Sequence, residues 1–91
     1  MRRQKRTRAR LIYEMLKVVA TEGPMPPTRL SYAVRMPYDR LAEMLRWLEK
    51  KGLIKVNDYG TKKEVEITKE GLKALYDLEK ALKILERLGL E

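Results

Sequence analysis

The sequence predicts a mainly α-helical domain with one small β-hairpin, in the order helix, helix, helix, strand, strand, helix. Apolar residues recur every three or four positions over most of the chain, which is the period of an amphipathic helix. The period changes to two only over residues 54–57 and 64–67, on either side of a polar, glycine-containing turn. A chain of 91 residues buries only about 60% of the surface that its unfolded form exposes, so we expect one domain with one core.

The first two helices are bounded by threonines and prolines. From Thr7, a candidate N-cap, apolar residues follow a helical stripe as far as Val19, and we expect this helix to end near residues 22–24. The prolines that follow require a short extended connector. Thr28 is the candidate cap of a brief second helix over residues 29–34.

The third helix has the clearest boundaries. Pro37 suits its first turn, where the missing N–H is not needed, and Gly52 suits the left-handed residue that ends a helix, so we expect a helix over residues 37–51. Its core-facing stripe consists of Leu41, Met44, Leu45 and Leu48. Its outward face carries Asp39, Glu43, Arg46 and Lys50, with Arg40 and Trp47 on one flank and Ala42 and Glu49 on the other.

A hairpin and a long final helix complete the chain. Residues 58–63 form the long, basic tip of the hairpin, and Thr68 caps a helix that runs to about Leu88 before Gly89. This helix contains more apolar surface than so small a core can use. We therefore expect residues 7–71 to form the main domain, and residues 72–91 both to cover its core and to pair two copies as a homodimer, with simple packing as the alternative. The predicted dimer contacts are Leu75, Leu78, Leu82, Leu85 and Leu88.

Positive charge is concentrated in two parts of the chain. The formal net charge is +8, from 21 Lys and Arg against 13 Asp and Glu. The first ten residues contain six cations and no acid, and residues 29–63 contain nine cations and four acids. This distribution predicts a polyanion-binding surface and, over residues 1–6, a disordered basic arm, for which a solubilising tail is the alternative.

The composition excludes several kinds of chemistry. The chain has no cysteine and no histidine, so it has no thiolate nucleophile, imidazole base or Cys/His zinc site. With no phosphate-cradling glycine loop either, we expect no enzyme, no cofactor, no metal and no small-molecule ligand. The scarcity of Asn and Gln among many charged residues is typical of thermophilic proteins. No segment approaches the roughly 20 apolar residues of a membrane span, which predicts a cytoplasmic protein.

Two helices joined by a tight turn and followed by a hairpin with a basic loop form the arrangement of a winged helix-turn-helix. Four runs of sequence carry a further resemblance: TRLSYAV, PYDRL, LRWLEKKGLI and ITKEGL. In these runs the chain resembles small archaeal winged-helix DNA-binding proteins, in particular the chromatin-type proteins that pair through a C-terminal helix. The resemblance extends over roughly residues 10–80.

The resemblance implies binding to double-stranded DNA by a transcription regulator or chromatin protein. The helix over residues 37–51 would enter the major groove, while the wing at residues 58–63 and the N-terminal arm would lie on the backbone or in a minor groove. The matching recognition positions are Tyr38, Arg40, Arg46, Trp47 and Lys50, and the matching wing positions are Tyr59, Thr61, Lys62 and Lys63. Arginine can pair with a guanine edge and lysine with a phosphate, and Arg35 is a further phosphate candidate. The arm contributes Arg2, Arg3, Lys5 and Arg6, and Arg8 follows directly after it.

Some points stay open from the sequence. Asp39 and Glu43 lie on the outward face, where they pair locally with cations, read a cytosine, or indicate that this face binds protein. A protein-interaction module of a transcription assembly is therefore the alternative function, and RNA binding is a lesser one. Trp47 borders the core stripe, so packing against neighbouring elements competes with base stacking. Tyrosines expected at the edge of the core or in an interface are Tyr13, Tyr32 and Tyr76.

Overall fold

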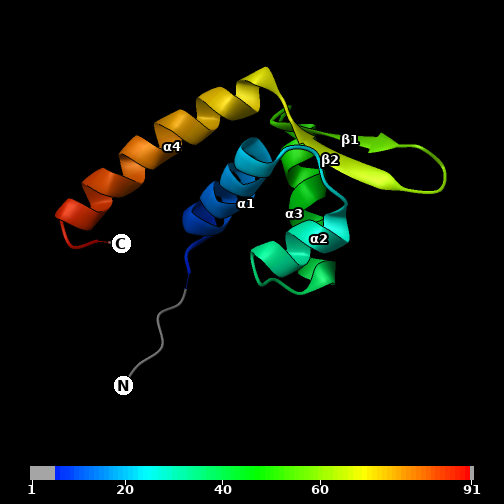
Figure 1. Cartoon of the computed structure of the whole chain (residues 1–91). Helices are drawn as coiled ribbons and strands as arrows, with labels where there is room; N and C mark the ends of the chain where they lie inside the picture. Colours follow the sequence, from blue (N-terminus) through cyan, green and yellow to red (C-terminus); the bar gives the residue numbers. More distant parts are fainter. Residues whose placement is uncertain (1–5, 91) are drawn as a thin grey trace.

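The computed structural model describes residues 6–90 and, within them, contains helices and strands in the predicted order (Figure 1). The elements are α1 (Arg8–Glu22), α2 (Pro27–Ala33), α3 (Tyr38–Lys50), β1 (Ile54–Asp58), β2 (Lys63–Ile67) and α4 (Lys69–Arg87). The strands pair antiparallel, with Val56 opposite Val65, and the hairpin projects to one side of the helices. The predicted winged helix-turn-helix architecture is therefore confirmed.

One hydrophobic core joins α1, α2, α3 and the hairpin. The predicted apolar stripes of α1 and α3 are buried, together with Met25 of the connector and Val65 of β2. The largest fully buried side chains are Met15, Leu16, Met25, Leu30, Leu41, Leu48 and Val65. Burial of a side chain of this size contributes roughly 1.5–3 kcal/mol, so this core is the main stabilising feature of the domain.

The proline-rich connector pairs with the edge of the hairpin. Met25 N donates a hydrogen bond to the Val65 carbonyl at 3.2 Å, and Val65 N donates to the Met25 carbonyl at 2.7 Å. The resulting single β-bridge is antiparallel. It holds the start of α2 beside β2, and so beside the base of the hairpin.

The outer helices have the ends that were predicted. Thr7 accepts a hydrogen bond from Arg10 N at 3.1 Å, and Thr68 accepts one from Gly71 N at 3.0 Å. In both cases the hydroxyl satisfies a backbone donor that has no partner within the helix. Gly52 follows α3 with a φ of 79°, the left-handed conformation expected of a helix terminator.

The starts of α2 and α3 differ from the prediction. Thr28 is not a cap, because α2 begins at Pro27 with Pro26 at its N-cap. Proline takes the first helical position because no partner for its N–H is needed there. α3 begins one residue later than predicted, at Tyr38, with Pro37 as its N-cap.

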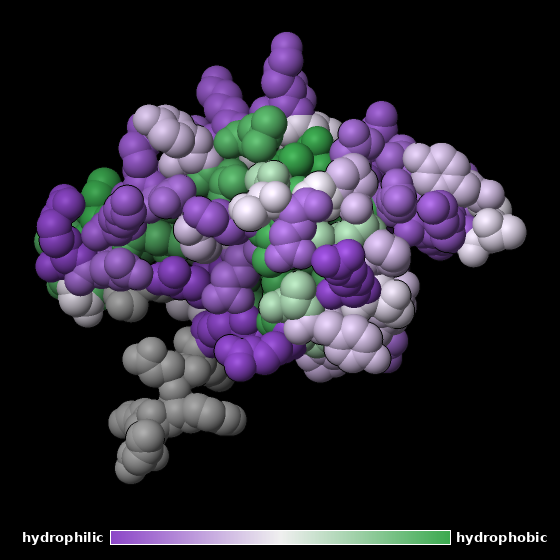
Figure 2. Space-filling view, viewed as in Figure 1, coloured by the Kyte–Doolittle hydropathy of each residue, from purple (hydrophilic) through white to green (hydrophobic). Residues whose placement is uncertain are grey.

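α4 packs along α1, so the first and last helices of the chain lie side by side. Leu82 is buried where the helices meet, and Arg10 of α1 pairs with Glu86 at 2.6 Å. Ile84 and Leu88 remain exposed, and Figure 2 shows apolar surface at this C-terminal end of α4. None of the helices within residues 6–90 is both long and apolar enough to cross a membrane.

Candidate nucleic-acid interface

The turn between α2 and α3 is fixed by two hydrogen bonds between Ser31 and Met36. The buried Ser31 hydroxyl donates to the Met36 carbonyl at 2.9 Å, and Met36 N donates to the Ser31 carbonyl at 3.0 Å. Arg35, inside this turn, has a φ of 54°. Because this left-handed conformation costs an L-residue roughly 1–2 kcal/mol, the surrounding turn must hold Arg35 in place. Its side chain is exposed next to the start of α3.

α3 has an outer face between two flanks. The outer face carries Asp39, Glu43, Arg46 and Lys50, all exposed, as predicted. Tyr38 lies on the flank toward the hairpin, whereas Arg40 and Trp47 lie on the flank toward the start of α1. The predicted outer face, and the predicted position of Arg40 and Trp47 together on one flank, are therefore confirmed.

The acids of the outer face have no cationic partner within residues 6–90. Arg46 and Lys50 share this face, but no ion pair there involves Asp39 or Glu43. The local pairing considered from the sequence is therefore not observed. Asp39 lies in the first turn of α3, where the helix dipole favours a carboxylate. In the part of the chain that the structure describes, no group of acidic side chains is placed to hold a metal ion.

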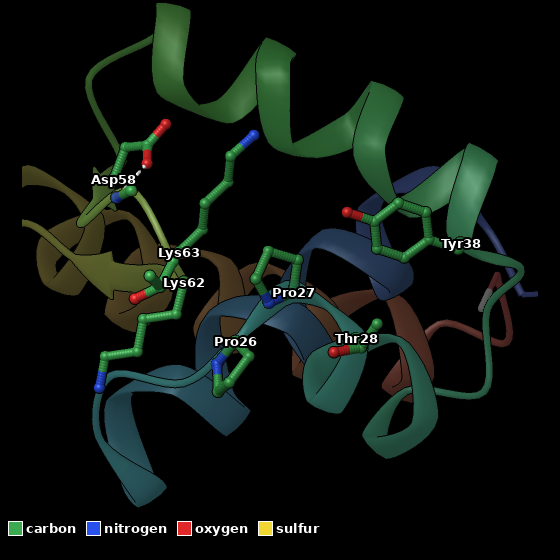
Figure 3. Close-up of a pocket in the computed structure, with 9 residues that line it drawn as sticks. Pro26, Pro27, Thr28, Tyr38, Asp58, Lys62 and Lys63 are labelled. Carbon is green, nitrogen blue, oxygen red and sulfur yellow. Dashed lines mark hydrogen bonds between the residues drawn. The ribbon is translucent and has the colours of Figure 1, made fainter.

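A groove separates the hairpin tip from α2 and the start of α3 (Figure 3). Lys63 extends across the groove toward α3, and the hydroxyl of Tyr38 faces the same space. Lys62 points away from α3. The carboxylate of Asp58 accepts a hydrogen bond from Gly60 N at 2.9 Å, so it shapes the turn at the tip. The groove thus brings a recognition-helix side chain and a wing lysine together.

Trp47 occupies the opposite flank of α3. The Arg8 guanidinium lies 4.8 Å from the centre of the indole ring, and the Lys51 ammonium lies 5.3 Å from it. The side chain is 37% exposed. Contacts of this kind contribute roughly 0.5–1 kcal/mol each at exposed sites. Packing against the start of α1, one of the two predicted roles of Trp47, is therefore observed.

Arg6, predicted as part of the disordered arm, contacts the folded domain instead. Its guanidinium pairs with the Glu14 carboxylate of α1 and donates to the Arg35 carbonyl at 3.1 Å. Sequence reasoning missed this contact because it depends on how α1 and the turn approach each other. The remaining arm positions Arg2, Arg3 and Lys5 lie outside the described residues.

Most of the predicted DNA-binding cations are exposed and lack an acidic partner within residues 6–90. Lys62 is an exception, with its ammonium 3.9 Å from the Glu64 carboxylate. Tyr59 and Thr61 of the wing tip are exposed as well. The cations without an acidic partner in this part of the chain are Arg8, Arg35, Arg40, Arg46, Lys50 and Lys63.

Of the two environments predicted for the tyrosines, the edge of the core fits only Tyr13. Tyr32 on α2 is 82% exposed and Tyr76 on α4 is 63% exposed, whereas Tyr13 is half-buried. The exposure of Tyr32 could have been predicted from the sequence, because Tyr32 lies about opposite Leu30 and Val34 on a helical wheel. Tyr32 therefore lies on the solvent-facing side of α2.

The predicted dimer contacts on α4 divide into two groups. Leu82 is buried within the protomer, so its assignment as a dimer contact was wrong: α4 uses that side against α1. Leu75, Leu78 and Leu85 are half-buried, and Leu88 is 65% exposed. The large apolar side chains left exposed on α4 and just after it are Leu72, Tyr76, Ile84, Leu88 and Leu90.

One protein family matches the chain by sequence. Residues 5–86 match the sequence model of the winged helix-turn-helix family. No curated protein matches the chain at a significant level. Among solved structures, the DNA-binding protein Sso10a-2 from Sulfolobus solfataricus is similar, with a TM-score of 0.83 and 25% sequence identity. The match covers 91% of this chain and 85% of that protein.

Two larger proteins share the same fold. The transcriptional regulator BldR from Sulfolobus solfataricus is 24% identical, with a TM-score of 0.75, over 87% of this chain and 60% of its own. The transcriptional regulator PcaV from Streptomyces coelicolor, solved with its natural ligand, is 20% identical, with a TM-score of 0.79, over 87% of this chain and 58% of its own. The chain thus spans about 60% of the length of these regulators.

Proposed function

The chain belongs to the winged helix-turn-helix family, and we propose that it binds double-stranded DNA as a transcription regulator or chromatin protein. The observation that carries this proposal is the presence of exposed cations on both flanks of α3. Lys63 extends from the wing on one side, and Arg8 and Arg40 are exposed on the other. Cations on both sides of an exposed helix match the phosphates that border a major groove. We place the protein in the cytoplasm, at the nucleoid, without catalytic activity.

In this proposal α3 enters the major groove, which is wide enough to admit an α-helix. Arg46 and Lys50 on the outer face reach base edges or phosphates. The wing lies along the backbone or in a minor groove, with Lys62 and Lys63 on phosphates. Arg35 and the cations of the arm contact phosphates on the other side, and these contacts position the domain without reading sequence.

A second candidate function rests on the acids of the outer face. Asp39 and Glu43 are exposed without a cationic partner in residues 6–90, and next to phosphates both would weaken binding. A basic protein surface would instead pair with them. On this alternative the domain is a protein-interaction module of a transcription assembly.

The homodimer is proposed through α4. Ile84 is 46% exposed and Leu88 is 65% exposed, next to the half-buried Leu85 on the same side of the helix. A second copy of α4 would cover this apolar strip. The contact would be the same patch on both copies, related by a two-fold axis, so the two recognition helices would address half-sites with the same symmetry.

Fluorescence anisotropy with labelled nucleic acids at physiological salt tests the proposed function. The wild-type protein is expected to bind duplex DNA more tightly than single-stranded RNA, and the double variant Lys62→Glu, Lys63→Glu is expected to lose most of this affinity. The matched control is Lys17→Glu, Lys69→Glu, which makes the same change of charge at exposed positions on α1 and at the start of α4. Equal loss in the two double variants would show that only net charge matters. No binding of duplex DNA by the wild type would favour the protein-interaction module.

A further inference from the structure

The groove beside the wing continues along α2. A second hollow lies between α2 and the following turn, and Thr28 and Tyr38 line both hollows. Tyr32 and Arg35 line the second hollow, and Lys63 lines the first. The two hollows therefore adjoin at Thr28 and Tyr38, and together they are called the groove below; Figure 3 shows its wing end.

Two aromatic rings and several cations line this groove. Tyr32 is 82% exposed and Tyr38 is 47% exposed, so both rings are accessible. Arg35 is at one end and Lys63 at the other, and both lack an acidic partner within residues 6–90. Asp58, the acid that lines the groove, has its carboxylate hydrogen-bonded to the backbone of the wing tip. Three cations line the groove, Arg35, Lys62 and Lys63, against this one acid, so the net charge of the lining is positive.

We infer that this groove binds unpaired nucleotides of DNA that continue from a bound duplex, with bases stacked on Tyr32 and Tyr38 and with Arg35 and Lys63 on the phosphates where the duplex strand continues as a single strand. In a duplex the faces of the bases are covered by their neighbours, so an exposed tyrosine ring can stack only on an unpaired base. Stacking on aromatic rings within a positively charged groove is the general mode of single-strand binding. The inference rests on the proposed function, because it places this strand next to the duplex held by α3.

The test compares a blunt duplex, the same duplex with a short single-stranded tail, the single strand alone and the single-stranded RNA of the same sequence, by fluorescence anisotropy. The tailed duplex is expected to bind at least about fivefold more tightly than the blunt one, since one stacked base contributes that much or more. Tyr32→Ala is expected to remove this difference and leave binding to the blunt duplex unchanged. Because Tyr32 is 82% exposed, the variant should fold, which circular dichroism checks.

Two further variants separate stacking from other effects. Tyr32→Phe keeps the ring and should keep the preference for the tailed duplex. Tyr76→Ala removes a tyrosine that is 63% exposed on α4, away from the groove, and should keep the preference as well. Loss of the preference in Tyr32→Phe would show a hydroxyl contact and overturn the inference.

The remaining outcomes distinguish this inference from the proposed function. Equal affinity of the wild type for tailed and blunt duplexes overturns the inference and leaves the proposed function standing. Binding of the tailed duplex and the single strand without binding of the blunt duplex overturns the proposed function and supports the groove. Tighter binding to the RNA than to the single-stranded DNA assigns the groove to RNA and overturns the inference, and binding to none of the probes overturns both.

Discussion

Gly71 lies directly against the backbone of Leu53, so that a Cβ added to Gly71 would come within 2.0 Å of the Leu53 carbonyl oxygen. The same carbonyl accepts a hydrogen bond from Thr68 N at 3.1 Å, and the Thr68 hydroxyl donates to the Gly52 carbonyl at 2.7 Å. These contacts attach the start of α4 to the segment between α3 and β1. The close approach explains why a helix accepts a glycine here, at a cost of roughly 0.5–1 kcal/mol relative to alanine.

Gly71→Ala is expected to destabilise the protein by about 1–3 kcal/mol, because the added methyl group meets backbone that cannot yield without moving α4. The measurement is the midpoint of thermal unfolding, which falls by roughly 4–8 °C per kcal/mol in a domain of this size. Lys73→Ala, an exposed change in the next turn of α4, serves as the control and should leave the midpoint nearly unchanged. Equal midpoints for Gly71→Ala and the wild type would contradict the close approach.

Arg35→Gly and Arg35→Ala remove the same cation but differ in backbone strain. Because Arg35 has a φ of 54°, the glycine variant should be more stable than the alanine variant by about 1 kcal/mol in chemical denaturation. Both variants should weaken duplex DNA binding to the same extent, since each loses one phosphate contact. Equal stability of the two variants would contradict the strained turn, and unchanged affinity in both would remove Arg35 from the interface.

Deletion of residues 2–5 is expected to weaken DNA binding and to flatten its dependence on salt. Each phosphate neutralised changes the slope of log K against log salt by about 0.9, and the deleted segment contains three cations. The matched control replaces Arg2, Arg3 and Lys5 by serine, which keeps the length of the chain. An unchanged slope in an anisotropy salt series would refute the role of the arm.

The double variant Ile84→Glu, Leu88→Glu is expected to be monomeric, whereas the wild type is dimeric at micromolar concentration in analytical ultracentrifugation. Both side chains are exposed in the protomer, so the secondary structure seen by circular dichroism should not change. Lys17→Glu, Lys69→Glu, which changes exposed positions on α1 and at the start of α4, should remain dimeric. A monomeric wild type at tens of micromolar would rule out the proposed pairing.

Local signals predicted most of the fold. The caps Thr7 and Thr68, the terminator Gly52 and the two-residue period of the hairpin each depend on a few neighbouring residues, and each is found where it was expected. The prediction that Thr28 caps α2 was wrong because two local signals compete at the start of this helix. Pro27 fits the first helical position, and the helix therefore begins before Thr28.

Contacts between distant segments could not be predicted in this way. Arg6 pairs with Glu14 and donates a hydrogen bond to the Arg35 carbonyl because the start of α1 meets the turn after α2. Leu82 is buried because α4 packs against α1, and the period of an amphipathic helix does not say which partner covers it. The candidate site was predicted as a set of residues on α3 and the wing, whereas the groove that joins them required the structure.

The central claim, that the outer face of α3 and the wing bind duplex DNA, is tested most directly by nuclear magnetic resonance with the ¹⁵N-labelled protein. On addition of a duplex, the amide signals of Arg46, Lys50, Lys62 and Lys63 are expected to shift, while those of Lys17 and Lys80 stay in place. Shifts confined to α4, or none on α3 and the wing at concentrations where anisotropy reports binding, would contradict the claim.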